Sequence, residues 1–475
     1  MLTYSFTNLG SEPLYQHLYK CIKNDILQGV LVVGEKLPSK RSFAKNLGIS
    51  TITVENAYAQ LISEGYLYSI PKKGFFVADC NVHVIRKENS ELPEITVNNL
   101  HLTAPNSTYF VDFSSNQTDL ENFPFSIWAK LIRELLNENR LELLTNPPSG
   151  GILSLRKAIS DHLLAFRGMH VLPEQIIIGA GTEYLYSLLI QLLGNDKDYG
   201  VEDPGYKKIS QIYKSHGVSC HFLAMDYCGV QISELENSRT DIVHISPSHH
   251  FPTGKIMPIS RRYELLGWAS KSPDRYIIED DYDSEFRLTG QPIPTLQSID
   301  ISGKVIYINT FTKSLASTIR ISYMILPRDL LQTFYKKLAF YSCTVSNFEQ
   351  FTLAHFISQG HFEKHINRMR NFYHHKRDVL LTTMKKSPLW NYITISEEDA
   401  GLHFLMKADT PLSDEEFCLR ASEQGIHITS LSQYYQTPPV NSQGVFLINY
   451  SSVPEDRMKE AVDRIYKGCI APQKS

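Results

Sequence analysis

The chain has 475 residues, of which 42% are hydrophobic, and this length suffices for at least two packed domains. The formal net charge of −3 gives the molecule no bulk attraction to nucleic acid or membranes, so DNA binding would require a local basic patch. The 7 cysteines show no CxxC or Cys/His ligand spacing, which argues against a disulfide framework or a metal site. The sequence has no signal-peptide pattern and no membrane-length apolar run, which predicts a cytoplasmic protein without membrane contact.

Three helical patterns and a hairpin pattern succeed one another at the start of the chain. The first helix is predicted over residues 13–29, where apolar side chains recur at helical spacing. Two short helices follow, over 39–48 and 50–65, and a tight glycine turn joins them, which is typical of a helix-turn-helix. Residues 66–77 then alternate as two short strands around a Pro-Lys-Lys-Gly turn, which predicts a wing.

The stretch "LPSKRSFAKNLGISTITVENAYAQLISEGYLYSIPKKGFFV" resembles the winged helix-turn-helix of GntR-type regulators almost end to end, whereas a small helical domain with solvated charges is the plainer alternative. This resemblance implies binding to a double-stranded DNA operator. The family often has an arginine where this chain has Thr51, so we expect base readout from Arg41 and from the hydroxyls of Thr51 and Thr53. The candidate DNA-binding residues are Ser39, Lys40, Arg41, Thr51, Thr53, Lys72, Lys73 and Gly74.

Residues 80–110 are polar, contain prolines and show no sustained hydrophobic period. This composition predicts a partly extended linker. We therefore expect a winged helix-turn-helix over residues 1–79, a linker over 80–110 and a large domain over 111–475.

From Phe113 onward, strand and helix patterns alternate, which predicts an α/β fold with a mainly parallel sheet. Three polar motifs directly follow apolar strand patterns: "GAGT" at residues 179–182, "EDDYDSEF" at 279–286 and "NTFTKSLASTIR" at 309–320. Because ligands of open α/β sheets bind at strand ends, we expect these motifs to meet at one site.

Each motif offers one piece of chemistry, and each alone is a weak signal. The glycine turn before Thr182 could cradle a phosphate at a helix start, although such turns are common structural features. Asp280 and Tyr282 lie on one side of an extended segment and could hold a protonated pyridine nitrogen and a ring oxygen, although the acids could instead bind a metal or cap a helix. Lys313 could form an imine. Together they fit pyridoxal 5′-phosphate (PLP), held by Lys313 as a Schiff base, with its phosphate contacted by Gly181, Thr182, Thr310, Thr312 and Arg320.

The motifs "EDPGY", "SPSHHFPTG", "IIEDDYDSEF" and "NTFTKSLASTIRISY", in this order behind the winged helix, resemble the MocR/GabR family of transcriptional regulators. The resemblance implies a PLP-dependent transferase-like domain of fold type I. It also implies that Lys313 carries the cofactor, that Asp280 contacts the pyridine nitrogen, that Tyr282 contacts the ring oxygen, and that Tyr206 stacks on the ring. A homodimer with the cofactor site near its interface is expected as well.

Three positions depart from the family pattern. Relatives that sense γ-aminobutyrate hold its carboxylate with two arginines, where this chain has Lys208 and Gln433. Lysine is a point charge without the bidentate fork of arginine, so we do not expect an ordinary γ-aminobutyrate sensor, and Lys208 is the candidate effector-binding residue. His250 replaces the usual glutamine, and we expect it to be a structural histidine that hydrogen-bonds a neighbour.

These observations favour a PLP-dependent DNA-binding regulator that senses an amine, an amino acid or PLP itself. An active PLP-dependent aminotransferase with an accessory DNA-binding domain stays open, because catalysis needs the same Lys313, Asp280 and Tyr282. A DNA-binding protein whose large domain is only a scaffold is disfavoured, because every expected PLP contact is present in the sequence.

Overall fold

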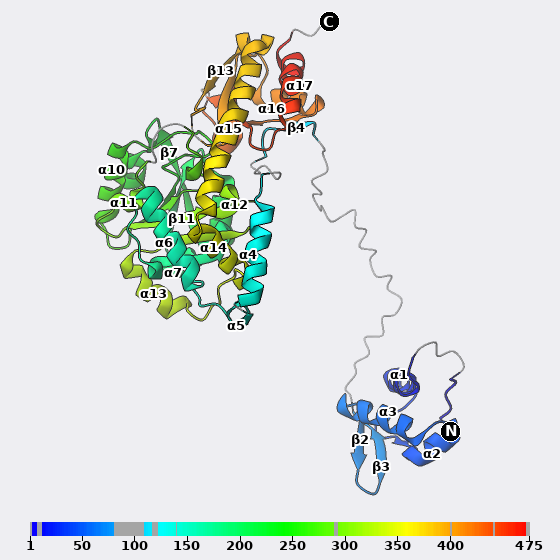
Figure 1. Ribbon diagram of the computed structural model, residues 1–475. Coiled ribbons are helices and arrows are strands. Elements are labelled where there is room, and N and C mark those ends of the chain that lie inside the picture. Colours follow the sequence, from blue (N-terminus) through cyan, green and yellow to red (C-terminus); the bar gives the residue numbers. More distant parts are fainter. Residues whose placement is uncertain are drawn as a thin grey trace. The chain divides into compact units, whose positions relative to one another are not determined.

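The computed structural model divides into two compact units, residues 1–105 and 106–475 (Figure 1). The predicted linker lies almost wholly outside the described residues, since placement resumes only at residue 109. Within the described part of the chain, no helix combines the length and the apolar character that a membrane crossing requires. The structure describes residues 2–6, 12–79, 109–115, 122–138, 140–288, 293–399, 401–439 and 442–471.

The small unit has three helices and a three-stranded antiparallel sheet in the order β1-β3-β2. The Ser39 and Ser50 hydroxyls cap α2 and α3 by accepting hydrogen bonds from backbone N–H groups, and Gly48 ends α2 in the left-handed conformation. Strand β1 lies between the first two helices, where no strand was predicted, and its Lys36 pairs with Phe76 of the wing. The elements are α1 (Leu14–Leu27), β1 (Lys36–Leu37), α2 (Lys40–Leu47), α3 (Thr51–Ser63), β2 (Leu67–Ile70) and β3 (Gly74–Val77).

The large unit is built on an eight-stranded sheet in the order β5-β12-β11-β10-β9-β6-β7-β8. The pairs in its centre are parallel, while β12 runs antiparallel to both of its neighbours and β8 runs antiparallel to β7. An α/β fold with a mainly parallel sheet is thus confirmed. The strands are β5 (Ile176–Ala180), β6 (Asp198–Asp203), β7 (Ser219–Asp226), β8 (Gly229–Val230), β9 (Ile242–Ile245), β10 (Tyr276–Asp280), β11 (Val305–Thr310) and β12 (Ile321–Ile325).

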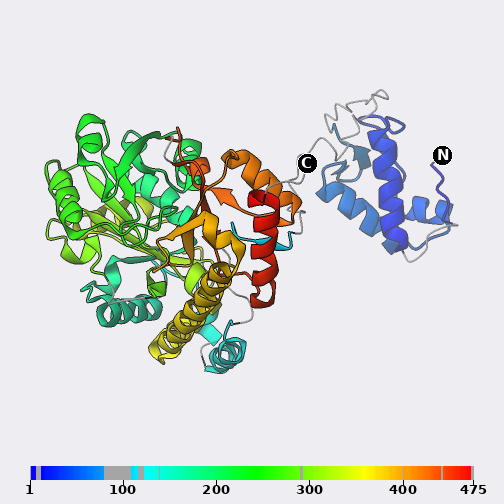
Figure 2. The ribbon, with the colours of Figure 1, turned by 90° about the horizontal axis from the view of Figure 1, so that it is seen from above.

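Both faces of this sheet are buried under helices, as the two views of Figures 1 and 2 show. Along β5, Ile176 and Ile178 belong to one apolar cluster and Ile177 to the other, because successive side chains of a strand point to opposite faces. The helices of the first part of the unit are α4 (Phe125–Glu138), α5 (Arg140–Leu144), α6 (Leu153–Arg167), α7 (Thr182–Leu193), α8 (Lys207–Ser215), α9 (Ile232–Asn237), α10 (Ile259–Ser270), α11 (Leu296–Ile299), α12 (Phe311–Ser314), α13 (Arg328–Leu338) and α14 (Asn347–Ser358).

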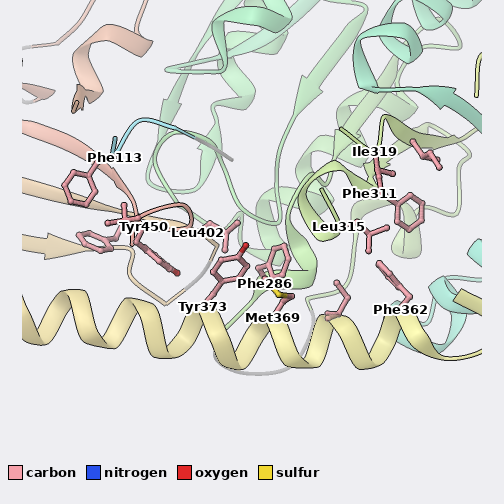
Figure 3. Close-up of a cluster of buried hydrophobic side chains, with 14 of the residues drawn as sticks. Phe113, Phe286, Phe311, Leu315, Ile319, Phe362, Met369, Tyr373, Leu402 and Tyr450 are labelled. Carbon is pink, nitrogen blue, oxygen red and sulfur yellow. The ribbon is translucent and has the colours of Figure 1, made fainter. Parts of the chain in front are cut away.

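The long helix α15 joins this core to a second, four-stranded antiparallel sheet in the order β13-β14-β17-β16. Figure 3 shows Phe362, Met369 and Tyr373 of α15 packed in a row against side chains of the large sheet region at one end and of the C-terminal part at the other. The remaining elements are β4 (Val111–Asp112), α15 (His361–Lys386), β13 (Ile393–Ser396), β14 (His403–Ala408), α16 (Asp414–Glu423), β15 (Ile426–His427), β16 (Thr429–Ser430), β17 (Val445–Asn449) and α17 (Glu455–Ile465).

Candidate functional site

The three polar motifs meet in one cavity of about 840 Å³ at the ends of the central strands. Gly181, the residue that precedes α7, is not among the residues that line this cavity, although the adjacent Thr182 is. Thr182 and Arg320, which are 138 positions apart in the sequence, thus line the same cavity. The predicted residues that line the cavity are Thr182, Tyr206, Lys208, Asp280, Tyr282, Thr310, Thr312, Lys313 and Arg320.

Lys313 is carried by the one-turn helix α12, directly after strand β11. Thr310 caps this helix, since its hydroxyl accepts a hydrogen bond from the Thr312 N–H at 3.2 Å, and Ser322 donates to the same hydroxyl at 2.8 Å. Burial lowers the pKa of the Lys313 amine to about 8, while the negative charge of Asp283 opposes this shift. Near neutral pH the lysine thus has a larger neutral, nucleophilic fraction than an ordinary lysine.

Asp280 ends strand β10 and is 6% exposed. Its Oδ2 accepts a hydrogen bond from the Tyr186 hydroxyl at 2.5 Å and lies 3.4 Å from His244 Nε2. Its Oδ1 is buried and has no hydrogen-bond partner among the described residues. An unpaired, buried carboxylate oxygen beside a cavity is costly unless a donor arrives with a ligand. Tyr186 and His244 were not singled out in the sequence, because neither belongs to the three motifs.

Gly181 is required where the backbone approaches Arg320. Its φ is +90°, and a Cβ there would lie 2.6 Å from Arg320 Nη2. Glu183, in the first turn of α7, forms ion pairs with Arg320 (3.3 Å) and with Lys208. The Lys208 hydrogen bond is the main cause that lowers the pKa of the Glu183 carboxyl. Glu183 was missed because an acid in a helix first turn is an ordinary feature.

Tyr282 is tied to a buried His–Asp pair. Its hydroxyl is 3.2 Å from His249 Nδ1, which lies 2.8 Å from Asp283 Oδ2. The ring of His249 packs so closely on Gly401 that a Cβ there would come within 1.9 Å. Burial raises the pKa of Tyr282 well above its ordinary value, so its phenol stays protonated.

The three departures from the family pattern occupy different surroundings. His250 is buried, Nδ1 lies 2.7 Å from the Thr253 hydroxyl, and burial lowers its pKa to about 3. Lys208 lies on the cavity wall. Gln433 is exposed, and the cavity lining includes the two tyrosines that follow it instead.

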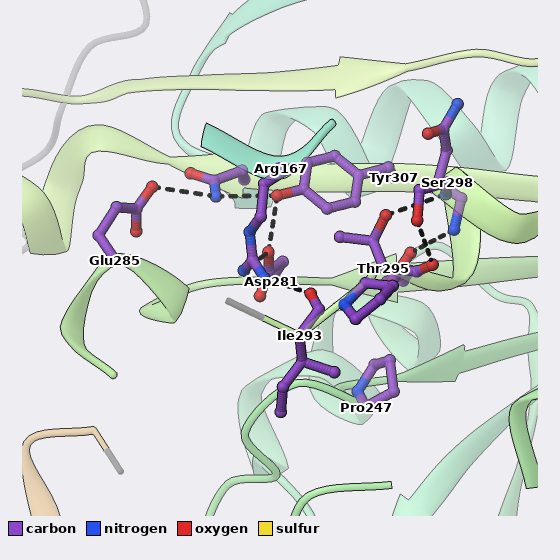
Figure 4. A network of polar contacts seen from close by, with 12 residues as sticks. Arg167, Pro247, Asp281, Glu285, Ile293, Thr295, Ser298 and Tyr307 are labelled. Carbon is purple, nitrogen blue, oxygen red and sulfur yellow. Dashed lines mark hydrogen bonds and ion pairs between the residues drawn. The ribbon is translucent and has the colours of Figure 1, made fainter. Parts of the chain in front are cut away.

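Hydrogen bonds and an ion pair around Asp281 hold the end of β10 in place (Figure 4). Asp281, next to Asp280, accepts a charge-assisted hydrogen bond from Arg167 at 2.8 Å and one from the Tyr307 hydroxyl at 2.7 Å. Arg167 and Asp281 are almost fully buried, and their opposite charges compensate each other. Neighbouring carboxylates thus have separate roles, with Asp281 holding the strand end and Asp280 facing the cavity.

The candidate DNA-binding residues fall into two groups. Ser39 is used as the cap of α2, and Thr53 donates its N–H to the Ser50 cap while its hydroxyl lies 2.8 Å from that of Ser50. Lys40, the first residue of α2, forms an ion pair with Glu55 in the second turn of α3 at 2.7 Å, which links the two helices. The exposed candidates are Ser39, Arg41, Thr51, Lys72 and Lys73, and the half-buried Gly74 begins β3 at the wing.

Residues 14–77 match the model for bacterial regulatory proteins of the gntR family. The chain is 37% identical over 454 residues to the uncharacterized HTH-type transcriptional regulator YdeL of Bacillus subtilis (95% of this chain, 96% of the relative). It is 30% identical over 473 residues to the probable rhizopine catabolism regulatory protein MocR of Rhizobium meliloti (98% and 95%). The fold is also that of a Pyrococcus horikoshii kynurenine aminotransferase, with a TM-score of 0.67 and 23% identity over 77% of this chain and 91% of that one. The chain therefore belongs to the MocR-type family of transcriptional regulators, in which a GntR-type winged helix-turn-helix is fused to an aminotransferase-like domain.

Proposed function

We propose that this regulator binds operator DNA through its winged helix and uses PLP, in the cavity of the large unit, to sense an amine, an amino acid or PLP itself. The observation that carries the proposal is the pairing, in one cavity, of a lysine whose pKa is lowered to about 8 with the unpaired, buried Oδ1 of Asp280.

The residues present fit PLP. Asp280 Oδ1 would accept a hydrogen bond from a protonated pyridine nitrogen, and the protonated phenol of Tyr282 would donate to the ring oxygen. Gly181, Thr182, Thr310, Thr312 and Arg320 would hold the phosphate. Tyr206, which packs edge-on against Phe251 at 5.8 Å, would cover the ring. When bound, PLP supplies an electrophilic carbon that Lys313 or a free amine can attack.

Lys208 is the residue that we propose for a carboxylate of the effector. In the structure its ammonium group is paired with Glu183, which also contacts Arg320. A carboxylate ligand would therefore compete with Glu183 for Lys208. Binding of the effector would thus alter the ion pairs of Glu183 at the phosphate-binding end of the cavity.

A homodimer is part of the proposal and is supported by the exposed surface of the large unit. Leu141 and Leu144, three residues apart on α5, are 82% and 79% exposed, Phe340 is 76% exposed, and contiguous exposed apolar surface marks interaction sites. Thr344, close to Phe340 in the chain, accepts a hydrogen bond from the Ala180 N–H at 3.0 Å, next to the glycine turn of the cavity. Light scattering should give twice the chain mass of 54.2 kDa, and Leu141→Asp with Leu144→Asp should lower it.

An active aminotransferase is the second candidate, and the geometry around Lys313 favours it as much as it favours a sensor. The amine that binds a cofactor is also the group that can move a proton during transamination. Steady turnover of an amino donor and a keto-acid acceptor, followed over many catalytic cycles, would establish the enzyme. A sensor should show no sustained keto-acid product.

Absorbance of the purified protein after reconstitution with PLP tests the proposal. The wild type should show a visible band above the protein absorption, and Lys313→Ala should lack it. Lys336→Ala, which removes an exposed lysine of α13, should retain the band. A wild type that stays colourless after reconstitution and removal of excess PLP would refute the proposed cofactor.

A further inference from the structure

The exposed face of α3 carries an apolar side chain that the fold of the small unit does not use. Ile52 is 68% exposed, more than any other large apolar side chain described in this unit. The opposite face of the same helix is fully engaged, since Val54, Ala57 and Tyr58 are buried in the core. Isolated exposed isoleucines are common on proteins, so the position of Ile52 decides what it means.

Ile52 lies in the first turn of the second helix of a helix-turn-helix. In this motif the N-terminal residues of the second helix reach base edges in the major groove. The hydroxyl groups of Ser50 and Thr53 are hydrogen-bonded to each other, and that of Ser50 also caps the helix. The exposed side chains left for bases in the first two turns are Thr51, Ile52, Glu55 and Asn56.

Two of these four side chains are complementary to A·T base pairs. Ile52 and Asn56 are four residues apart and therefore lie on one face of α3, about 5–6 Å apart at Cβ. A carboxamide can bind adenine N6 and N7 in a bidentate manner, and an apolar side chain can contact the 5-methyl group of thymine. Glu55 is paired with Lys40, so its carboxylate is compensated at this surface.

We propose, building on the operator binding proposed above, that Ile52 and Asn56 read A·T base pairs in each half-site of the operator, Ile52 through a thymine methyl group and Asn56 through adenine. The wing lysines hold the helix in the groove by contacts to phosphates. The spacing of the two side chains places the thymine within about two base-pair steps of the adenine, since bases of one strand are about 3.4 Å apart.

Deoxyuridine in place of thymidine removes only the methyl group, which makes the proposal directly testable. The full-length protein would first select its operator from a randomised duplex library. Each thymidine of one half-site would then be replaced singly by deoxyuridine, and affinity measured by fluorescence anisotropy. One position should lose about four-fold in wild-type affinity, the value of one buried methyl group. Ile52→Ala should bind the thymidine and deoxyuridine duplexes equally.

Val33→Ala is the matched control, because Val33 is also exposed (62%) but lies outside α3, and it should keep the thymidine preference. Asn56→Ala should relax selection of adenine by about five-fold or more. The proposal is overturned if no single deoxyuridine weakens the wild type, if Ile52→Ala keeps the preference, or if Val33→Ala loses it. Misfolding of Ile52→Ala would also abolish the thymidine preference. This cause is excluded if the variant melts at the same temperature as the wild type.

Discussion

Several side chains of the cavity in the large unit, Asp280 among them, are buried, whereas those of the reading surface, the exposed face of α3 with Ile52 and Asn56, are open to solvent. Asp280 is 6% exposed, has an unpaired oxygen and lines the same cavity as a lysine with a lowered pKa, whereas Ile52 is 68% exposed. Burial gives the cavity its chemistry, because desolvation alters the charge states of the groups there. On the solvent-exposed reading surface, desolvation does not alter the charge states of the side chains in this way. Single changes should therefore be severe in the cavity and modest on α3 and the wing.

The largest effect is expected from Asp280→Asn. Replacing the carboxylate leaves a protonated pyridine nitrogen without its charged partner, which costs about 2–5 kcal/mol in PLP affinity. Tyr186→Phe removes only the hydrogen bond to Oδ2 and should cost about 1 kcal/mol. Equilibrium titration of the visible band measures both. Equal affinities of Asp280→Asn and the wild type would show that burial of this carboxylate has no role in binding.

The pH dependence of PLP capture tests the lowered pKa of Lys313. Only the neutral amine attacks, so the rate of band formation should rise with pH and level off above about pH 8. A lysine with an ordinary pKa of about 10.4 would continue to accelerate well beyond pH 9. Stopped-flow absorbance between pH 6 and 10, with free lysine as the reference amine, distinguishes the two curves.

Alanine variants of two glycines distinguish the cost of backbone strain from that of a steric clash at the cavity. Gly181 and Gly168 both have positive φ values, +90° and +65°, but only a Cβ at Gly181 would meet Arg320. Both alanine variants should lose about 1 kcal/mol or more of stability, and Gly181→Ala should in addition weaken binding of PLP. Thermal melting and the band titration measure the two effects. Equal PLP affinity in the two variants would remove Gly181 from the phosphate site.

The effects expected on the DNA-binding surface are smaller than that of Asp280→Asn, and Arg41 and Lys73 should differ in kind. Arg41→Ala should weaken operator binding by about 1–3 kcal/mol and relax sequence preference if the guanidinium meets a base. Lys73→Ala should weaken binding to all sequences alike and reduce the salt slope by about one. Anisotropy titrations at several salt concentrations test both, and an unchanged affinity in the double variant would exclude this surface.

The fold was predictable because its signals are local or periodic. Alternating strands and helices indicate the parallel sheet, and the glycine turn marks the helix-turn-helix. Strand β1 was missed because a two-residue strand has no period of its own and exists only through pairing with the wing. In the cavity, motif residues after strands were predictable, but Tyr186, His244 and Glu183, and His249 behind Tyr282, were not. These four depend on which helices and loops pack beside the strand ends, and tertiary contacts alone decide that.

The central claim is that the state of the cavity controls affinity for DNA. The direct test is operator binding by the wild type and by Lys313→Ala, each with and without PLP, at fixed salt and across a panel of amino acids. The account predicts that PLP or PLP with one amino acid changes wild-type affinity by about five-fold or more, the scale of allosteric coupling, and leaves Lys313→Ala unchanged. Equal wild-type affinity under all of these conditions would contradict it.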